Sequence, residues 1–452
     1  MAPNTSGNGA RFPLAKGRIE ESFDDKRPRY TKSEAIAEAN RCLYCADAPC
    51  IKACPTSIDI PTFIHKISTG NVKGAARTIF EANLLGTSCS RVCPVEVLCV
   101  GDCVYNHWDR EPIAIGRLQR YATETALDDD ADFLKKKKAS KKSGKKVALV
   151  GGGPASLACA GYLSLMGHEA TIFEKRALPG GLNTTGIAPY KLKSDDALRE
   201  LERIVALGDI TVKTGVEVGN GAGQVSTASL LKDFDAIFIG IGLGKDSSLG
   251  VAGEDGAGVY GAVHLIERLK TDPSLKLTGV TRAVVVGGGN TAIDIAHELA
   301  VAGVKEVMMV YRRDEAAMSG YEHEMAWARE DKVRLVENRV PTAVVRDAKG
   351  NVTGLTCART ENGKPVAGTD ETIACELVAV AIGQARLTAL AAAFEGVKLD
   401  DKGRVVVDEA TCRTGNARVF AGGDCVNGGK EVVNAVEHGK RAARAMHAAF
   451  GG

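Results

Sequence analysis

Long apolar stretches are missing from this chain of 452 residues. No run of about 18 apolar residues, the length that crosses a bilayer as a helix, occurs anywhere in it. The opening stretch, MAPNTSGNGARFPLAKG, has no apolar segment of the kind that a secretory signal carries. A strong excess of one charge is missing as well, since the formal net charge is only +2. We therefore expect a cytoplasmic protein that has neither a membrane nor a nucleic-acid partner.

Cysteine, by contrast, is plentiful and unevenly placed. Eight of the 13 cysteines fall between Cys42 and Cys103. The other five are scattered singly, and we interpret them as small buried apolar side chains: Cys159, Cys357, Cys375, Cys412 and Cys425. Because a reducing cytoplasm disfavours stable disulfides, the clustered cysteines are expected to bind a metal.

The clustered cysteines form two groups. The first is Cys42, Cys45, Cys50 and Cys54, in RCLYCADAPCIKACP, and the second is Cys89, Cys93, Cys99 and Cys103. The spacing of the first group is similar to a ferredoxin run in which the last cysteine, followed by proline, ligates a different cluster. Paired cysteines are also typical of four-thiolate zinc sites. The spacing alone leaves zinc and iron–sulfur open.

A dinucleotide-binding pattern begins after the cysteine-rich region. KVALVGGGPASLACAGYLSLMGHEATIFEK, residues 146–175, predicts a strand, a glycine turn, a helix and a second strand. Such a turn places free backbone N–H groups and the helix dipole where a pyrophosphate binds. Gly151 and Gly153 take the first two glycine positions, and Ser156 is small enough to replace the third. Glu174 ends the second strand, where a carboxylate can accept both hydroxyls of an adenosine ribose.

The same pattern returns in RAVVVGGGNTAIDIAHELAVAGVKEVMMVYRR, residues 282–313. Tyr311 stands where the first unit has its acidic residue, and Arg312 and Arg313 follow it. Two guanidinium groups without a carboxylate favour a phosphate on that ribose. The alternative is that both arginines merely face solvent. Because the complete pattern occurs twice, we expect two nucleotide-binding domains.

The C-terminal region carries a third glycine turn. RVFAGGDCVNGGKEVVNAVEHGKRAA, residues 418–443, predicts a strand, a turn with Asp424 and a long helix from about Val432. This pattern closes the flavin domain of two-dinucleotide flavoproteins, where the aspartate holds the ribityl chain. IFIGIGLG (237–244) and VAVAIGQ (378–384) are strand-to-glycine segments expected where the chain passes between domains.

Together these residues resemble the flavin-containing subunit of two-subunit bacterial dihydropyrimidine dehydrogenases, and the N-terminal half of the single-chain mammalian enzyme. More distantly, the chain is similar to the small subunit of bacterial glutamate synthase. The resemblance runs from Arg18 to Ala449, and its most specific stretches are CLYCADAPC, GAARTIFEANLLG, CSRVCPVEVLCVGDC and PIAIGRLQR. It implies an α+α/β fold. A helical N-terminal bis-[4Fe–4S] domain precedes two Rossmann-like dinucleotide-binding domains, with the NAD(P)H domain inserted in the FAD domain.

The expected domain boundaries follow from this arrangement. Residues 1–134 form the helical iron–sulfur domain. Residues 135–146 form a solvated basic linker, which lacks the interleaved aromatic residues of a nucleic-acid-binding segment. Residues 147–270 and 387–452 are the two segments of the FAD domain, and residues 271–386 form the NAD(P)H-binding domain between them.

The resemblance also implies the ligands of the two clusters. One cluster would bind Cys42, Cys45, Cys50 and Cys103. The other would bind Cys54, Cys93, Cys99 and Gln119, which leaves Cys89 a spectator. Spacing alone favours Cys89 over Gln119. A structural zinc ion gives no reason for attachment to two dinucleotide domains, whereas clusters can take single electrons from a flavin, so we expect iron–sulfur.

The resemblance implies binding residues for both dinucleotides. Those for FAD are Val92, Gly151, Gly152, Gly153, Pro154, Ala155, Glu174, Leu182, Lys191 and Asp424. Those for NADPH or NADH are Gly288, Gly289, Asn290, Thr291, Arg312, Arg313, Ala381, Ile382 and Gly383. Lys191 stands where an arginine is often found. Ser319 stands where the mammalian enzyme has another phosphate-binding arginine, which weakens the case for NADPH.

We therefore expect an electron-input oxidoreductase subunit within a hetero-oligomer. NAD(P)H would reduce the flavin, and two clusters would pass electrons to an FMN-containing partner that reduces uracil or thymine. No catalytic acid or base is expected on this chain. The alternatives are an NADPH oxidoreductase like the glutamate synthase small subunit, serving another acceptor, and a non-enzymatic, metal-stabilised interaction module. A thioredoxin reductase-like enzyme would need a C-x-x-C beside the second glycine motif, and the sequence has none there.

Overall fold

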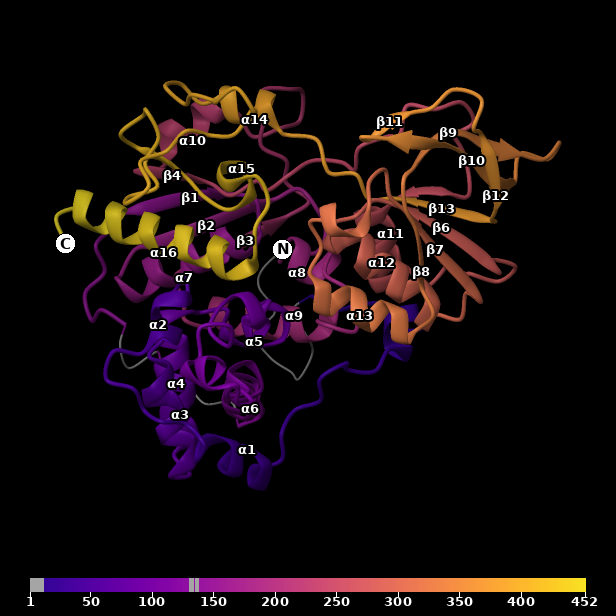
Figure 1. Cartoon of the computed structure of the whole chain (residues 1–452). Coiled ribbons are helices and arrows are strands. Elements are labelled where there is room, and N and C mark those ends of the chain that lie inside the picture. The colour runs from indigo at the N-terminus through magenta and orange to yellow at the C-terminus, as the bar shows by residue number, and fades with distance from the viewer. Residues whose placement is uncertain (1–11, 130–133, 135–137) are drawn as a thin grey trace.

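The computed structural model of the chain describes residues 12–129, 134 and 138–452. It contains a helical domain, a first α/β domain and a second α/β domain, which lie at the bottom, upper left and right of Figure 1. Parts of the expected helical domain (1–11 and 130–133) and of the expected linker (135–137) lie outside the described residues.

The helical domain consists of short helices joined by tight turns. Its elements are η1 (Ile19–Ser22), α1 (Lys32–Ala39), α2 (Pro49–Ala53), α3 (Ile60–Ser68), α4 (Val72–Ala82), α5 (Gly86–Val92), η2 (Val95–Val97), η3 (Val104–Trp108) and α6 (Ile115–Asp128). α1 begins with a capping box, in which Thr31 and Glu34 each accept the other's backbone N–H. Helices α3 and α4 bury Phe63 and Ile79. The core that they form includes three of the clustered cysteines.

The first α/β domain is built from two segments of the chain. The first segment contributes β1 (Lys146–Val150), α7 (Pro154–Leu165), β2 (Glu169–Glu174), α8 (Leu182–Thr185), α9 (Ser194–Val205), β3 (Ile210–Thr214), α10 (Thr227–Asp233) and β4 (Ala236–Ile239). The second contributes α14 (Thr388–Ala392), β14 (Val419–Ala421), α15 (Asp424–Asn427) and α16 (Val432–Ala449). The strands form a parallel sheet in the order β14-β4-β1-β2-β3. Helices α7, α9 and α16 cover one face, and α10 and α14 cover the other.

The second α/β domain lies between those two segments in the sequence, as expected. Its elements are β5 (Val259–Gly261), α11 (Ala262–Thr271), β6 (Arg282–Val286), α12 (Asn290–Val301), β7 (Glu306–Val310), η5 (Glu315–Ala317), α13 (Glu322–Glu330), β8 (Arg334–Val336) and β13 (Leu377–Val380). The parallel sheet has the order β5-β13-β6-β7-β8. An antiparallel sheet packs beside it and contains β9 (Arg339–Arg346), β10 (Val352–Glu361), β11 (Lys364–Pro365) and β12 (Glu371–Ala374).

The second sheet begins before the boundary expected at residue 271. β5 pairs in parallel with β13. α11 buries Leu265 and Ile266 in the core that also contains α12 and β6. Residues 259–270 therefore belong with the second α/β domain rather than with the first. A strand as short as β5 carries no hydrophobic periodicity, so the sequence pattern did not reveal it.

Two crossing segments join the α/β domains side by side. The Gly244 N–H donates to the carbonyl of Ala385 at 2.7 Å, and the Ser247 N–H donates to that of Gly383 at 2.9 Å. The chain thus leaves and re-enters the first α/β domain through one pair of hydrogen-bonded segments.

The described part of the basic stretch is mostly exposed, and several of its lysines pair with carboxylates of the first α/β domain. Lys138 and Lys142 each pair with Asp209 at 2.6 Å, and Lys145 pairs with Asp235 at 2.9 Å. These lysines lie along the edge of the first α/β domain because its loops present carboxylates there.

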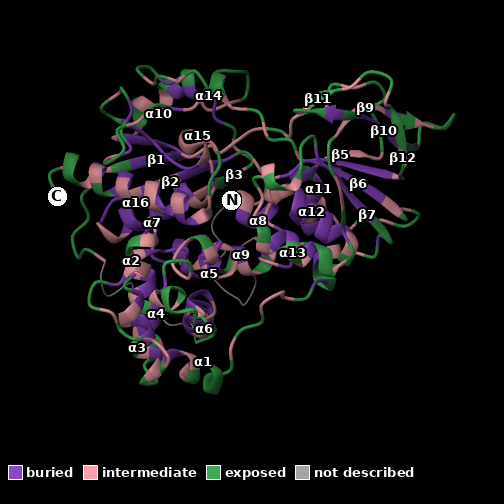
Figure 2. Cartoon of the chain, viewed as in Figure 1, coloured by how far each residue is buried: buried purple, intermediate pink, exposed green. Residues whose placement is uncertain are grey.

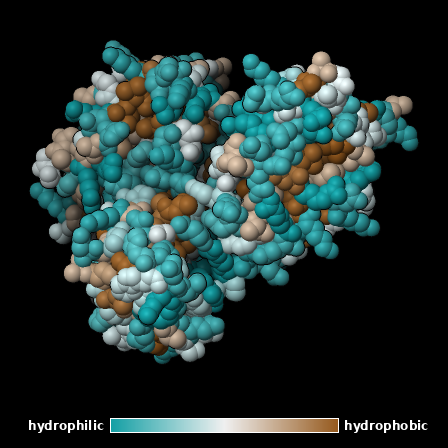
Figure 3. Space-filling model, viewed as in Figure 1, coloured by the Kyte–Doolittle hydropathy of each residue, from teal (hydrophilic) through white to brown (hydrophobic). Residues whose placement is uncertain are grey.

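Buried residues fill both parallel sheets and the helix faces that cover them, as Figure 2 shows. The visible surface is mostly hydrophilic, with apolar side chains gathered in small patches (Figure 3). Among the described residues, no helix is long and apolar enough to cross a membrane.

Candidate functional site

The first glycine turn joins β1 to α7. Gly151 has a φ of 92°, and a Cβ there would lie 2.5 Å from the carbonyl oxygen of Gly240. Only glycine fits that position. Gly153 is the N-cap of α7, and the Glu174 carboxylate at the end of β2 accepts the Gly152 N–H at 2.7 Å. The turn thus brings the open N–H groups of a helix and a carboxylate together, as a dinucleotide requires.

A second glycine pair packs on this turn. The Gly180 N–H donates to the carbonyl of Gly152 at 2.8 Å, and Gly181 lies against the same turn. Leu182 then begins α8. The next residue, Asn183, is buried, yet neither atom of its side-chain amide has a hydrogen-bond partner. Because buried amides are normally satisfied, this orphaned group fits a site that takes a polar ligand.

Asp424 is the first residue of α15, after Gly423 with its φ of 76°. Burial raises the pKa of Asp424. Arg386, from the crossing segment, lies next to Gly428 in the same turn, and its Nη1 is buried without a hydrogen-bond partner. The amide nitrogen of Asn427 is unsatisfied in the same way. Neither Arg386 nor Asn427 was predicted from the sequence; for Arg386, the available signal was a basic residue two positions after a strand-to-glycine crossing.

The second glycine turn joins β6 to α12. Gly287 has a φ of 148°, and a Cβ there would lie 2.3 Å from the carbonyl oxygen of Ala381. The segment 381–383 therefore packs on the turn through its first residue, while the other two are exposed. Asn290 and Thr291 begin α12 directly after the turn.

Tyr311 takes the place of the acidic residue in this second unit. A Cβ on Gly288 would lie 2.5 Å from the Tyr311 ring. The Tyr311 hydroxyl donates to the carbonyl of Ala317 at 2.7 Å and accepts a bond from Arg313 at 2.7 Å. Arg312 is exposed, and within the described part of the chain its guanidinium forms no hydrogen bond or ion pair. The turn is therefore flanked by one anchored and one unengaged guanidinium group.

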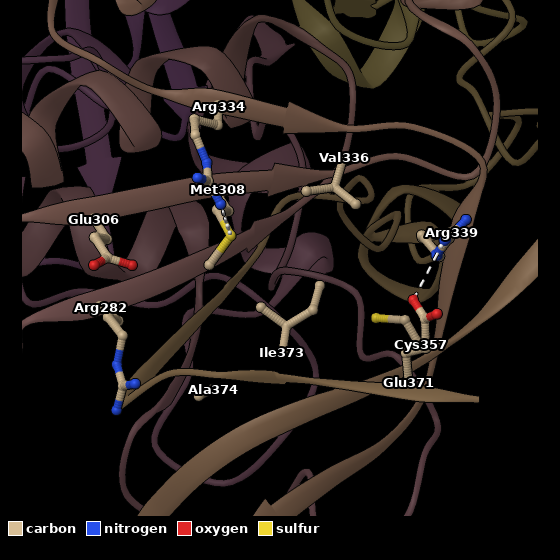
Figure 4. Close-up of a pocket in the computed structure, with 10 residues that line it drawn as sticks. All are labelled: Arg282, Glu306, Met308, Arg334, Val336, Arg339, Cys357, Glu371, Ile373 and Ala374. Atoms are coloured by element: carbon tan, nitrogen blue, oxygen red, sulfur yellow. Dashed lines mark hydrogen bonds and ion pairs between the residues drawn. The ribbon is translucent and has the colours of Figure 1, made fainter.

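A cavity of about 370 Å³ lies between the parallel and antiparallel sheets of the second α/β domain (Figure 4). Its lining includes Arg282, Glu306 and Arg334, which are the first residues of β6, β7 and β8. Dinucleotides bind at the carboxyl ends of parallel strands. Three lining residues of the cavity lie at the amino ends, and no residue of the glycine turn lines it, so the cavity is separate from that turn.

Most of the implied cysteine ligands lie near other members of their expected set, although Cys99 of the second set also lies near Cys50 of the first. Among the described residues, no three or more Cys, His, Asp or Glu side chains are arranged so that they could hold a metal ion. The first set, which we call the outer thiol group, contains Cys42, Cys45, Cys50 and Cys103. Burial raises the pKa of Cys50 to about 12, with further contributions from the nearby thiols of the other three. Tyr44, at a φ of 53°, turns its backbone N–H toward the Cys42 sulfur.

The second set, which we call the inner thiol group, contains Cys54, Cys93, Cys99 and also Cys89. A hydrogen bond with Cys89 and burial raise the pKa of Cys93, and the thiols of Cys99 and Cys54 lie close enough to add to this shift. The Gln119 amide nitrogen on α6 donates to the first carbonyl of α5 at 2.7 Å. Of the two candidates for the fourth ligand, Cys89 thus lies on α5 and Gln119 contacts its first residue.

The helical domain is fastened to the first α/β domain around α5. Glu200 of α9 is fully buried, and its carboxylate accepts the N–H groups of Thr87 and Ser88 at 2.6 and 3.0 Å. It also accepts the Ser88 hydroxyl at 2.5 Å. Lys440 of α16 donates to two carbonyls of the helical domain at 2.9 and 3.1 Å. α5 ends at Val92, so these contacts fix the helix that delivers the inner thiol group.

We expect Glu200→Ala to lower the free energy of unfolding by about 2–4 kcal/mol, because it leaves buried donors at the start of α5 unsatisfied. Denaturant unfolding followed by helical circular dichroism measures the loss. Arg199→Ala is the matched control, since Arg199 lies next to Glu200 on α9 but makes only a half-exposed pair with Asp128 at 2.9 Å. Equal losses in the two variants would contradict the capping role of Glu200.

Lys191 lies at the contact between the two α/β domains. Its Nζ is 2.7 Å from Asp294 on α12 and 2.6 Å from Glu324 on α13. Burial alone would lower the pKa of Lys191, but the two carboxylates raise it overall. Burial, followed by the effect of Asp294, raises the pKa of Glu324 to about 7. The resemblance implies that Lys191 binds flavin, and no feature of the sequence indicated its carboxylate partners.

Comparison with known families connects these features. Residues 18–131 match the family described as dihydropyrimidine dehydrogenase domain II, 4Fe-4S cluster. Residues 145–439, which carry both glycine turns, match the family described as pyridine nucleotide-disulphide oxidoreductase. The chain belongs to the pyridine nucleotide-disulphide oxidoreductases. Within that family it carries an added iron–sulfur domain, and it is an iron–sulfur flavoprotein that uses NAD(P)H.

Similar proteins cover nearly the whole of this oxidoreductase. The glutamate synthase (NADPH) small chain of Escherichia coli K12 is 34% identical over 95% of this chain and 94% of that protein. The NAD-dependent dihydropyrimidine dehydrogenase subunit PreT of the same strain is 35% identical over 94% of this chain and 96% of that protein. These relatives confirm the resemblance to flavin-containing subunits of dihydropyrimidine dehydrogenases.

Solved structures support the fold of the two α/β domains. Thioredoxin reductase of T. acidophilum superimposes with a TM-score of 0.54 at 20% identity, over 68% of this chain and 99% of that one. FprA of Mycobacterium tuberculosis in complex with NADPH superimposes with a TM-score of 0.52 at 19% identity, over 67% of this chain and 84% of that one. The expected fold class, a helical iron–sulfur domain followed by Rossmann-like domains, is confirmed.

Proposed function

We propose that this chain is the electron-input subunit of a two-subunit dihydropyrimidine dehydrogenase. It oxidises NAD(P)H and delivers electrons to an FMN-containing partner that reduces uracil or thymine to the dihydropyrimidine. The observation that carries the proposal is that the helical domain with both thiol groups packs, through α5, against an α/β domain that has a dinucleotide turn of its own. Oxidation of a nicotinamide needs only the two dinucleotide turns, whereas iron–sulfur clusters serve to move electrons singly.

The residues around the first turn fit FAD. The open N–H groups at the start of α7, the Glu174 carboxylate and Asp424 supply the pyrophosphate, ribose and ribityl contacts that the resemblance implies. The unsatisfied Asn183 amide and Arg386 guanidinium provide polar groups that still need partners. A bound flavin accepts a hydride and releases electrons one at a time. The role of the protein is to hold and orient the two dinucleotides and to keep water from the reacting atoms.

The placement of the thiol groups suggests the direction of electron flow. Cys54 and Cys89 of the inner thiol group share a core with Val433 at the start of α16, on the first α/β domain, and Cys103 of the outer group belongs to the same core. Cys42, Cys45 and Cys50 of the outer thiol group are only partly buried, and the first two flank the exposed Leu43 and Tyr44, whereas Cys54 and Cys89 of the inner group are buried. An exposed apolar side chain, Val97 at 58%, also lies two residues before Cys99 of the inner group. We propose two [4Fe–4S] clusters, one on each group, with electrons leaving through the outer one to the partner of a hetero-oligomer.

A second candidate function rests on the relatives. The glutamate synthase small chain matches over as much of this chain as the dihydropyrimidine dehydrogenase subunit does. An electron-input subunit of that kind would use the same turns and thiol groups and would differ in its acceptor. We favour the pyrimidine acceptor because LCVGDC and IGRLQR in the helical domain are closer to that enzyme. In either case we propose a cytoplasmic location.

The fourth ligand of the inner cluster can be tested directly. We expect Gln119→Leu to alter the EPR signal of one reduced cluster, because an amide oxygen that ligates iron cannot be replaced by a methyl group. Cys89→Ala should leave the signals of both clusters intact. Loss of a cluster in Cys89→Ala alone would reverse the assignment.

The oxidoreductase assignment itself is tested by the purified chain. One FAD and about eight iron atoms per chain are expected, together with bleaching of the flavin absorbance when NAD(P)H is added without oxygen. A colourless protein that contains only zinc would contradict the proposal and support a metal-stabilised interaction module.

A further inference from the structure

The two α/β domains meet through a buried ionic contact. Lys191 lies in the loop between α8 and α9 of the first α/β domain, while Asp294 and Glu324 lie on α12 and α13 of the second. The side chains of all three are at most 12% exposed. The Tyr190 hydroxyl, from the same loop as Lys191, donates to the Asp294 carboxylate at 2.6 Å. We call Tyr190, Lys191, Asp294 and Glu324 the interdomain latch.

A second buried lysine, Lys270, binds the loop 186–193 that carries Tyr190 and Lys191. Lys270 of α11 is fully buried, and its Nζ donates to the carbonyls of Ile187 and Leu192 at 2.8 and 2.7 Å. The ring of Tyr190 lies against that of His297 on α12, with centroids 4.2 Å apart. Helices α11, α12 and α13 of the second α/β domain thus all contact the loop 186–193 of the first.

The latch is connected to the second glycine turn through the start of α13. The N–H groups of Ser319 and Gly320 donate to the carbonyl of Gly288 at 3.1 and 3.0 Å. The Tyr321 N–H donates to the side-chain oxygen of Asn290 at 2.8 Å. Residues 319–321 lead directly into α13, so any shift of this helix also shifts the backbone that borders the turn.

Buried ion pairs add little net stability, because desolvation opposes the attraction of the charges. Their strict geometry instead selects one arrangement of the parts that they join. In the latch, a single ammonium group is shared by carboxylates from two helices, and a phenol satisfies one of them further. Such a contact specifies the orientation of the second α/β domain more narrowly than an apolar surface would.

We propose that Lys191, Asp294 and Glu324 are positioning residues that fix the orientation between the two glycine turns and thereby set the rate of hydride transfer. The hydride carries two electrons and one proton from the nicotinamide, which is oxidised, to the flavin, which is reduced. The latch residues exchange neither electrons nor protons in this step. The proposal rests on the proposed function only for the use of NAD(P)H and FAD, and it does not depend on the final acceptor.

The test compares Lys191→Met, which removes the charge and keeps the length of the side chain, with Glu324→Gln, which keeps the shape of the carboxylate. Hydrogen exchange of the holoprotein, without any acceptor, should become at least tenfold faster in α13 and in the loop 186–193. Stopped-flow reduction of the flavin should show a limiting rate at least tenfold lower in Lys191→Met. The apparent Kd for NAD(P)H should change less than twofold, since the glycine turn remains. Glu324→Gln should show smaller changes in the same directions.

Lys26→Met is the matched control. Lys26 pairs with Glu330 at the other end of α13 at 2.9 Å, but the Glu330 side chain is 64% exposed. This variant should change neither hydrogen exchange nor the limiting rate. If Lys191→Met does not fold, Glu324→Gln decides the matter by the same readouts. Unchanged exchange and an unchanged limiting rate in Glu324→Gln would overturn the latch, as would loss of bound flavin from Lys191→Met with the protection of α13 intact. Failure of the wild type to reduce its flavin with NAD(P)H would instead contradict the proposed function.

Discussion

Cys45→Ser is expected to abolish delivery of electrons to the partner subunit while leaving reduction of the flavin by NAD(P)H intact. Cys45 belongs to the outer thiol group and directly follows the exposed Leu43 and Tyr44. A hydroxyl is a poor ligand for iron, so the outer cluster should be lost or altered. Replacing a residue that only supports a metal ligand typically lowers metal affinity or activity about 10- to 100-fold. Replacing the ligand itself should lower electron delivery by more than that. Uracil-dependent oxidation of NAD(P)H measures the delivery, and ferricyanide reduction measures what remains.

Cys357→Ala is the control for that experiment. Cys357 is a scattered, fully buried cysteine on β10 of the second α/β domain, far in the chain from the thiol groups. The Cys357→Ala variant should retain both uracil-dependent oxidation of NAD(P)H and ferricyanide reduction. Retention of uracil-dependent turnover in Cys45→Ser would show that electrons do not pass through the outer thiol group. An equal loss in Cys357→Ala would mean that the effect is general destabilisation.

Replacing Arg312 and Arg313 by alanine is expected to remove a preference for NADPH over NADH. Arg313 is held beside the second glycine turn by the Tyr311 hydroxyl, and Arg312 is exposed next to it. Loss of a charge-assisted contact to a ribose phosphate costs about 1.5–3 kcal/mol, so kcat/KM for NADPH should fall about 10- to 100-fold. The value for NADH should change little, because NADH has no phosphate at that position. Steady-state kinetics with both nucleotides provide the measurement.

Arg334→Ala serves as the control for the arginine variants, because Arg334 lines the cavity at the amino ends of the strands. It should leave the ratio between NADPH and NADH unchanged. If the wild type uses NADH as well as or better than NADPH, both arginines are only surface charges. Ser319, which stands where the mammalian enzyme has an arginine, would then account for the missing preference.

The local features of the two dinucleotide units could be predicted from the sequence. Glycine turns follow apolar strands closely, so the pattern and the structure involve the same few residues. Ser156 can replace the third glycine because it faces Gly240, which has no side chain. A Cβ on Gly240 would lie only 2.2 Å from the Ser156 hydroxyl oxygen. A residue as small as glycine on one side makes room for serine on the other.

Contacts between domains could not be predicted in the same way. Lys191 and Glu324 are distant in sequence, as are Glu200 and the start of α5, and neither pair produces a local pattern. Their meeting depends on how whole domains pack, and the sequence periodicity describes only which face of each helix is buried. The resemblance located Lys191 as a functional position, but only the structure gives its carboxylate partners.

The most direct test of the account is anaerobic oxidation of NAD(P)H by the purified chain, with and without its co-purified FMN-containing partner, in the presence of uracil. The account predicts that the chain alone reduces ferricyanide but leaves uracil untouched, and that the mixture consumes NAD(P)H and forms dihydrouracil in equal amounts. Reduction of uracil by the chain alone would contradict the division into two subunits. Turnover only with a glutamate synthase large subunit would assign the chain to that enzyme instead.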